Sequence, residues 1–443
     1  WDIWTALGRE VADPIILESH FQLDGFTTFA RGARAIIDAD RNLNRGRHVA
    51  QALSPLAGGD DHFLDGGVDT LQIETCQDML QVKCAVYAAV EAMRRCGRRV
   101  PICVTVTVET TGTMLVGTEV AAALVVLDSL PVDMIGFNCA TGPDMMQENV
   151  RYLCSSGRYP VAVLPNAGLP RNDGGRAVYD LSAEMLADYH EVFVKDFGAA
   201  MVGGCCGTAP AHIKALFDRV GSLAPKAPQG RLEPHVASNY GAVALDQPGT
   251  SPLIIGERCN ANGSKQFRTY QENRDWDGCV EMGREQVREG SHALDVCTAF
   301  VGRDEIADMT EVVSRMRGSV TAPLVIDSTE YGVLEAALKL YGGKAIINSI
   351  NFEDGEKAAS DRLKLAKKFG ASVIALTISR RTSLGSRFRR KSRLLRRAVT
   401  ILCERSLTLS RESFMGSPVS RPEARTTLRW VMSVFLMRRN ISW

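Results

Sequence analysis

The sequence predicts an α/β protein built from two TIM-type (β/α)8 barrels in tandem, both of them incomplete. Short apolar runs alternate with single helical stretches over residues 68–220, and the same alternation restarts at residue 252 and continues to residue 378. Strands that are separated by single helices form parallel sheets, either open or closed into a barrel. A complete barrel takes about 250 residues, which is more than either half offers. We therefore expect the last five strands of one barrel, followed by the first five of another.

In the first module, residues 61–221, the expected strands are 68–74, 102–108, 132–138, 160–166 and 199–204. Apolar residues recur at helical spacing between them, for example over residues 78–95 and 182–198. A further helix is expected to begin after Thr208 as its N-cap, with Pro210 in its first turn. Residues 1–60 show no β/α period and form an unmatched N-terminal segment.

Residues 222–251 are rich in Ala, Pro and Gly and carry no sustained period, which predicts a linker. In the second module, residues 252–378, the expected strands are 252–257, 292–297, 321–328, 344–349 and 371–378, with helices at 277–290, 331–342 and 355–370. The β/α pattern ends there, so this module is expected to contain only the N-terminal half of a barrel.

The net charge of +1 conceals a basic C-terminal segment. Residues 379–443 contain 15 Arg and 1 Lys against 3 Glu, a net charge of +13. Such a segment can form a nucleic-acid-binding arm, but its Arg–Ser richness and apolar end are more typical of a shifted reading frame. We therefore expect a non-native or disordered tail and no nucleic-acid partner.

No apolar run approaches the ~20 residues of a membrane helix, so no membrane partner is expected. The 12 cysteines are scattered without short paired spacings, which argues against a disulfide framework and favours the reducing cytoplasm.

Three cysteines follow expected strands of the first module. Cys139 comes directly after the strand that ends at Asn138, and Cys205 and Cys206 follow the strand that ends near Gly204. Functional residues of barrels lie where strands end, and three thiolates with an open fourth position form a catalytic zinc arrangement. Flanking glycines would let the backbone turn tightly around such a cluster. Buried, inert thiols are the alternative interpretation.

The motifs around these cysteines resemble a known family. The stretches "GGVDTLQIETCQD", "GFNCATGP", "PNAGLP" and "MVGGCCGT" are similar to the homocysteine-binding module of cobalamin-dependent methionine synthases. Betaine–homocysteine methyltransferases share the three-cysteine layout. In the second half, "GERCNANGSKQFR", "ALDVC", "VIDSTE", "INSINFEDGEK" and "GASVIALTI" resemble the pterin-binding module that follows it in the same family. The resemblance covers about residues 58–378.

The resemblance implies roles for matched residues of the first module. Cys139, Cys205 and Cys206 would be zinc ligands, with the homocysteine sulfur as the fourth. Glu74 would contact the amino group of the substrate, since a carboxylate suits an ammonium group.

In the second module, Asp327 and Asn348 match positions that hydrogen-bond the pterin ring, and Asp295 is a weaker candidate. A carboxylate can accept two N–H bonds from the amidine edge of a pterin. Related modules often carry Asn where this chain has Cys297.

The implied reaction transfers a methyl group from 5-methyltetrahydrofolate through cobalamin to zinc-bound homocysteine, giving methionine and tetrahydrofolate. The cobalamin-binding module, with its D-x-H-x-x-G motif, does not occur in this sequence and would be a partner. The first strand of the family, which ends in a "DGAMGT"-like motif, also has no match in residues 1–60. Two alternatives stay open: a truncated or frame-shifted, inactive fragment, and a cobalamin-independent homocysteine S-methyltransferase.

Overall fold

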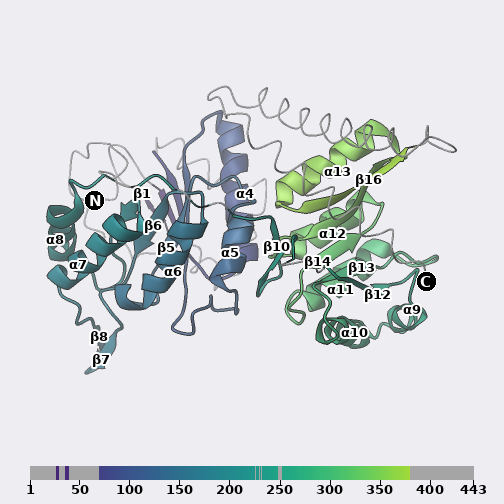
Figure 1. Ribbon diagram of the computed structural model, residues 1–443, viewed down its shortest axis with the longest axis horizontal. Helices are drawn as coiled ribbons and strands as arrows, with labels where there is room; N and C mark the ends of the chain where they lie inside the picture. Colours follow the sequence, from purple (N-terminus) through teal and green to yellow (C-terminus); the bar gives the residue numbers. More distant parts are fainter. Residues whose placement is uncertain are drawn as a thin grey trace. The chain divides into compact units, whose positions relative to one another are not determined.

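The computed structural model describes residues 26–28, 35–38 and 69–379, except residues 225, 229, 231 and 248–251 (Figure 1). The chain divides into two compact units, Trp1–Leu232 and Glu233–Trp443. Each unit contains a sheet with parallel strands that alternate with helices, which confirms the predicted α/β class.

The sheet of the first unit contains the five strands that the sequence predicts, all parallel and in sequential order. They are β3 (Leu71–Cys76), β4 (Ile102–Val106), β5 (Met134–Asn138), β6 (Val161–Leu164) and β9 (Met201–Val202). The connecting helices are α4 (Met79–Cys96), α5 (Val120–Leu127), α6 (Pro143–Ser156) and α7 (Ala183–Val192), which continues into a π-helical turn (Phe193–Phe197), and α8 (Pro210–Val220) follows β9.

Two short strands extend this sheet beyond the predicted set. β1 (Phe26–Thr28) and β2 (Ala35–Asp38) are antiparallel to each other, and β2 runs parallel to β3 with Asp38 opposite Glu74. The sequence gives no β/α period here because strands of three and four residues are too short to establish one. The other residues of the segment 1–60 lie outside the described part of the chain.

Local capping fixes the ends of several helices. The Asp78 side chain accepts the Leu80 N–H at the start of α4, and Gly97 ends that helix in the left-handed conformation. The expected N-cap at Thr208 is wrong, because Ala209 occupies that position. The Thr208 hydroxyl instead donates to the Cys205 carbonyl at 2.6 Å.

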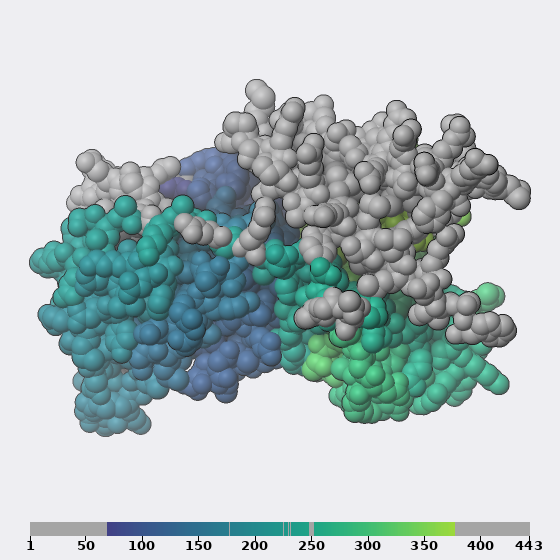
Figure 2. Space-filling view, in the orientation of Figure 1, coloured from purple at the N-terminus to yellow at the C-terminus, as the bar shows by residue number. Residues whose placement is uncertain are grey.

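A small hairpin interrupts the connection between β6 and α7. Its strands are β7 (Arg171–Asp173) and β8 (Arg176–Val178). The hairpin stands out from the first unit as a small lobe, at lower left in Figures 1 and 2. Asn166, which precedes the hairpin, and Tyr179, which follows it, both lie against the loop that carries Cys205 and Cys206.

The second unit contains a five-stranded parallel sheet in sequential order, again as predicted. Its strands are β12 (Ile255–Asn260), β13 (Ala293–Cys297), β14 (Leu324–Asp327), β15 (Ile346–Phe352) and β16 (Ser372–Ser379). Its helices are α9 (Lys265–Glu272), α10 (Trp276–Arg288), α11 (Glu305–Met316), α12 (Tyr331–Leu340) and α13 (Gly355–Phe369). Helices α9 and α11 add to the three helices predicted in this module.

The segment 222–251, expected to be a linker, contains a hairpin that belongs to the second unit. It is formed by β10 (His235–Ala237) and β11 (Ala242–Ala244). Val236 is fully buried against Ala293, Val325 and Ile346, near the amino ends of three strands of the sheet. The hairpin therefore covers the end of the sheet opposite to the strand ends that carry the polar residues discussed below.

Tyr341 links this hairpin to the sheet. Its hydroxyl accepts the Leu324 N–H at 3.1 Å and donates to the Ala237 carbonyl at 3.4 Å, and the side chain is buried.

We expect Tyr341→Phe to lower the free energy of unfolding by about 1–2 kcal/mol, because it leaves a buried N–H without this acceptor. Urea unfolding of the second unit checks this, with Tyr331→Phe on the exposed surface as the control. Equal stability of both variants would contradict the structural role of the Tyr341 hydroxyl.

No helix within the described residues is long and apolar enough to cross a membrane. Apart from Ser379, the last residue of β16, the predicted basic tail 379–443 lies outside the described residues.

Candidate metal and pterin sites

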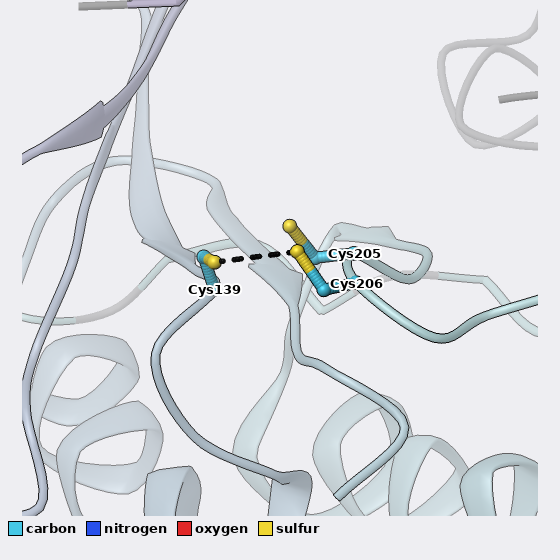
Figure 3. A group of neighbouring side chains, drawn as sticks. All are labelled: Cys139, Cys205 and Cys206. Carbon is cyan, nitrogen blue, oxygen red and sulfur yellow. Dashed lines mark hydrogen bonds between the residues drawn. The ribbon is translucent and has the colours of Figure 1, made fainter. Parts of the chain in front are cut away.

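The structure brings Cys139, Cys205 and Cys206 together. Cys139 follows β5, and the Cys205–Cys206 pair follows β9, so all three lie at the carboxyl edge of one parallel sheet. Their sulfur atoms lie within 4.8 Å of one another, and the Cys139 and Cys206 sulfurs are 3.8 Å apart. Figure 3 shows the Cys205 and Cys206 side chains next to each other on one loop, with the Cys139 sulfur facing them. Within the described residues, this is the group that could hold a metal ion.

The backbone around the cysteines turns sharply. Cys139 and Ala140 adopt the left-handed conformation, with φ of 62° and 59°. Gly207 also has a positive φ of 80°, and a Cβ there would lie 2.2 Å from the Tyr179 ring. A Cβ on Gly204 would lie 2.3 Å from the Thr208 methyl group. A side chain at either position would collide with Tyr179 or Thr208, so both positions require glycine.

The loop after β6 holds the cysteine pair through its backbone. The Cys205 N–H donates to the Pro165 carbonyl at 2.7 Å, and the Cys206 N–H donates to Asn166 Oδ1 at 3.1 Å. The Ala167 N–H in turn donates to the Cys206 carbonyl at 2.9 Å. The "PNAG" and "GGCCG" motifs are thus one hydrogen-bonded unit.

Asn138 connects the cysteines to two other strands. Its side-chain carbonyl accepts the Thr75 N–H at 2.8 Å and the Thr105 hydroxyl at 2.7 Å. Its amide group donates to the Thr75 hydroxyl at 2.8 Å and lies 3.9 Å from the Cys205 sulfur. The residue is 1% exposed. Sequence reasoning used Asn138 only as the end of a strand and missed this role, since the partners of its side chain are 33 to 67 residues away in the chain.

The three thiols share protons unequally. Hydrogen bonds from Cys139 and then Cys205 lower the pKa of Cys206, so that this sulfur carries negative charge most readily. Hydrogen bonds with Cys139 and Cys206, and then burial, raise the pKa of Cys205. Cys206 is therefore the thiol of the cluster that ionises first.

Glu74 lies near the end of β3 and is buried. Its carboxylate accepts a hydrogen bond of 2.8 Å from Gln72 Nε2. The next residue, Thr75, is bonded to Asn138, which places Glu74 one residue from the network that supports the cysteines.

In the second unit, the predicted residues Asp295, Asp327 and Asn348 converge on three adjacent strands: Asp327 ends β14, whereas Asp295 and Asn348 lie within β13 and β15. Asn348 Nδ2 donates to Asp295 Oδ1 at 2.9 Å, and Asp327 lies opposite Asn348 in the sheet. Asn260, at the end of β12, lies 3.3 Å from both carboxylates through its Nδ2. Sequence reasoning did not single out Asn260, although its position at a strand end beside "GERC" is the same signal that identified the other three.

Cys297, at the end of β13, faces Asn262. The Asn262 Nδ2 atom lies 3.6 Å from its sulfur, and burial raises the pKa of this thiol to about 11. Cys297 is therefore a neutral thiol at the edge of the polar cluster.

Two family models match the chain. Residues 46–220 match the model of homocysteine S-methyltransferase, and residues 256–392 match that of pterin binding enzymes. The first match begins within the segment 1–60, and the second continues past Ile378 into the arginine-rich segment.

The chain is also similar to curated methionine synthases. It is 48% identical to that of Mycobacterium tuberculosis over 319 residues and 46% identical to that of Mycobacterium leprae over 324 residues, each covering 71% of this chain. The chain spans only 27% of the length of these relatives. Among solved structures, the apo homocysteine methyltransferase MmuM from Escherichia coli matches with a TM-score of 0.30 and 25% identity, covering 39% of this chain and 57% of that one. Residues 46–220 are thus similar to homocysteine S-methyltransferases and residues 256–392 to pterin binding enzymes, and over 71% of its length the chain is a homologue of the methionine synthases.

Proposed function

We propose that the chain transfers a methyl group to homocysteine at a zinc ion held by Cys139, Cys205 and Cys206. The methyl group would come from 5-methyltetrahydrofolate at the second unit, and cobalamin on a separate binding module would carry it to homocysteine, giving methionine and tetrahydrofolate. The observation that carries this proposal is the convergence of three sulfurs at the carboxyl edge of a homocysteine S-methyltransferase domain.

The cysteine cluster fits a zinc ion. Zn–S bonds of ~2.3 Å at tetrahedral angles separate the sulfurs by about 3.8 Å, and the Cys139 and Cys206 sulfurs are 3.8 Å apart. An all-thiolate set is typical of zinc rather than of hard cations such as magnesium. When bound, zinc would lower the pKa of the substrate thiol and so supply a thiolate nucleophile at neutral pH. The need for reduced cysteines is consistent with a cytoplasmic enzyme.

The protein residues orient the substrate and stabilise charge. The Asn138 amide, 3.9 Å from the Cys205 sulfur, points a positive dipole at the cluster and so offsets its negative charge. The buried carboxylate of Glu74 is the proposed partner of the homocysteine ammonium group.

In the second unit we propose that Asp327 and Asn348, with Asp295, hydrogen-bond the pterin ring of 5-methyltetrahydrofolate. This substrate is a poor methyl donor unless its N5 is protonated or polarised, so its site has to supply a proton or hydrogen bonds. The two carboxylates and two carboxamides gathered here offer both donors and acceptors.

Zinc content and proton release test the first site. We expect the purified full chain to bind about one zinc ion per molecule and to release about one proton when homocysteine is added, because the substrate thiol ionises on binding. Homoserine, which has a hydroxyl in place of the thiol, should release none. A chain that retains no zinc under reducing conditions would refute the proposal.

Removing one acceptor tests the second site. We expect Asp327→Asn to weaken the binding of 5-methyltetrahydrofolate about tenfold, because a hydrogen bond to a charged group is worth about 1.5–3 kcal/mol. Isothermal titration calorimetry of the full chain measures the change. The control is Asp277→Asn on α10, where the carboxylate is 94% exposed. Equal affinities of the two variants would exclude Asp327 from the pterin site.

A further inference from the structure

We infer that Arg268 and Phe300 form a subsite for the negatively charged glutamyl tail of the folate. This inference rests on the proposed function of the second unit, and it adds a residue pair outside the polar cluster described above.

Arg268 lies on α9, close to that cluster. Its Nη1 atom donates to the Ala261 carbonyl at 3.1 Å. Ala261 directly follows Asn260, whose side chain lies 3.3 Å from both Asp295 and Asp327. The guanidinium group is therefore bonded to the residue that follows β12, and that residue is next in the chain to Asn260 of the polar cluster.

The Phe300 ring contacts the Arg268 guanidinium group from the loop that follows the neighbouring strand. It lies in the loop after β13, with its ring centroid 5.5 Å from the guanidinium carbon of Arg268. Such a cation–π contact orients the flat guanidinium group and limits its motion. The subsite is thus contributed by the segments that follow two adjacent strands of the sheet.

The Phe300 loop is anchored on both sides. Gln271 Nε2, on the same helix as Arg268, donates to the Thr298 carbonyl at 2.8 Å and to Asp308 at 2.6 Å. Arg303 makes two hydrogen bonds to the same Asp308 carboxylate, at 2.5 and 2.7 Å. These contacts fix both ends of the loop, so the Arg268–Phe300 pair is formed before any ligand binds.

The charge of Arg268 is not balanced within the described part of the chain. No carboxylate there lies within ion-pair distance of its guanidinium, whereas Arg258 and Arg303 of the same unit each pair with carboxylates. The bond to Ala261 uses one N–H group, and the guanidinium can offer others to a ligand. A planar, weakly hydrated guanidinium is well suited to bind a carboxylate through two parallel hydrogen bonds.

The folate molecule matches this arrangement. Its pterin ring is uncharged and carries hydrogen-bond donors and acceptors, which fit the Asp–Asn cluster. Its carboxylates lie at the other end of the molecule, beyond an aminobenzoyl ring. A pterin held by Asp327 and Asn348 can direct this tail over the carboxyl edge of the sheet, where Phe300 offers aromatic surface and Arg268 a positive charge.

The test compares two ligands on the full chain. The probes are 5-methyltetrahydrofolate, which carries the carboxylates, and 6-methyltetrahydropterin, which has the ring system without the tail. We expect Arg268→Gln to weaken the binding of 5-methyltetrahydrofolate about tenfold and to leave that of 6-methyltetrahydropterin within about twofold. Arg268→Lys should recover part of the loss, because it restores the charge without the planar fork.

Arg317→Gln is the matched control. Arg317 is also partly buried and also donates through Nη1 to a backbone carbonyl, that of Leu340, at 2.9 Å. It lies at the C-terminus of α11, just before β14, and so at the amino edge of the sheet. Its replacement should change neither affinity.

The outcomes separate this inference from the proposed function. Equal loss of both ligands in Arg268→Gln, or loss of neither, would overturn the tail subsite while leaving the pterin site in place. Failure of the unaltered chain to bind either ligand would overturn the proposed pterin site, and the subsite with it.

Discussion

Cys206→Ser is expected to abolish stoichiometric zinc binding and, with it, the release of a proton on addition of homocysteine. A serine hydroxyl is a far poorer anionic ligand than a thiolate. Cys206 is also the sulfur whose pKa is lowered by hydrogen bonds from Cys139 and Cys205, so its loss removes the group in the cluster that ionises most readily. Atomic absorption measures the metal, and a pH indicator in weak buffer measures the proton.

Cys154→Ser and Cys84→Ser are the controls for this experiment. Cys154 lies on α6 and Cys84 on α4, both partly buried, and burial raises the pKa of Cys154 to about 12 and that of Cys84 to about 11. Neither belongs to the metal-binding group, so both variants should keep zinc and proton release. Retention of a full zinc equivalent by Cys206→Ser would show that the metal is held elsewhere.

Asn138→Ala is expected to lower the free energy of unfolding by about 3 kcal/mol. The carboxamide is buried and bonds to Thr75 and Thr105 on two neighbouring strands, so truncation leaves their polar groups unpaired and creates a cavity. Zinc affinity should also fall about 10- to 100-fold, as is typical when a group that orients metal ligands is removed. Chemical denaturation and competition with a zinc chelator measure the two effects.

Asn172→Ala provides the comparison for Asn138→Ala. Asn172 lies on the exposed β7–β8 hairpin, where its side-chain oxygen accepts the Gly175 N–H at 2.9 Å. Its removal should change stability by less than about 0.5 kcal/mol and leave zinc affinity unchanged. If Asn138→Ala bound zinc as tightly as the unaltered chain, the hydrogen bonds of Asn138 would be structural only.

Local patterns were sufficient to predict five parallel strands in each unit, but not β2, which runs parallel to β3. Each strand is a short apolar run followed by a helix of regular period, and this information lies within about ten to twenty neighbouring residues. Those strand ends also indicated which polar residues could meet, since the carboxyl ends of parallel strands share one edge. Asp327 and Asn348 are an example, because the sheet register places them directly opposite each other.

Features with a weak local signal were missed or misplaced. The β10–β11 hairpin lies in an Ala-, Pro- and Gly-rich segment, and Val236 is buried only because strands more than 50 residues further along the chain cover it. The N-cap of α8 is Ala209 and not the predicted Thr208, because the Thr208 hydroxyl donates a hydrogen bond to the Cys205 carbonyl.

The order of five strands in each sheet, and the position of three cysteines after two of these strands, could be predicted from the sequence. The distance of 3.8 Å between Cys139 Sγ and Cys206 Sγ, which lie 67 residues apart in the chain, became evident only in the folded structure. The folded structure also decided that Asn138 and Asn166 support the cluster, and that Asn260 joins the two aspartates of the second unit. Hydrophobic periodicity and strand propensity depend on residues that are close together in the sequence. The contacts of these side chains form only when packing of the sheet brings distant segments of the chain together.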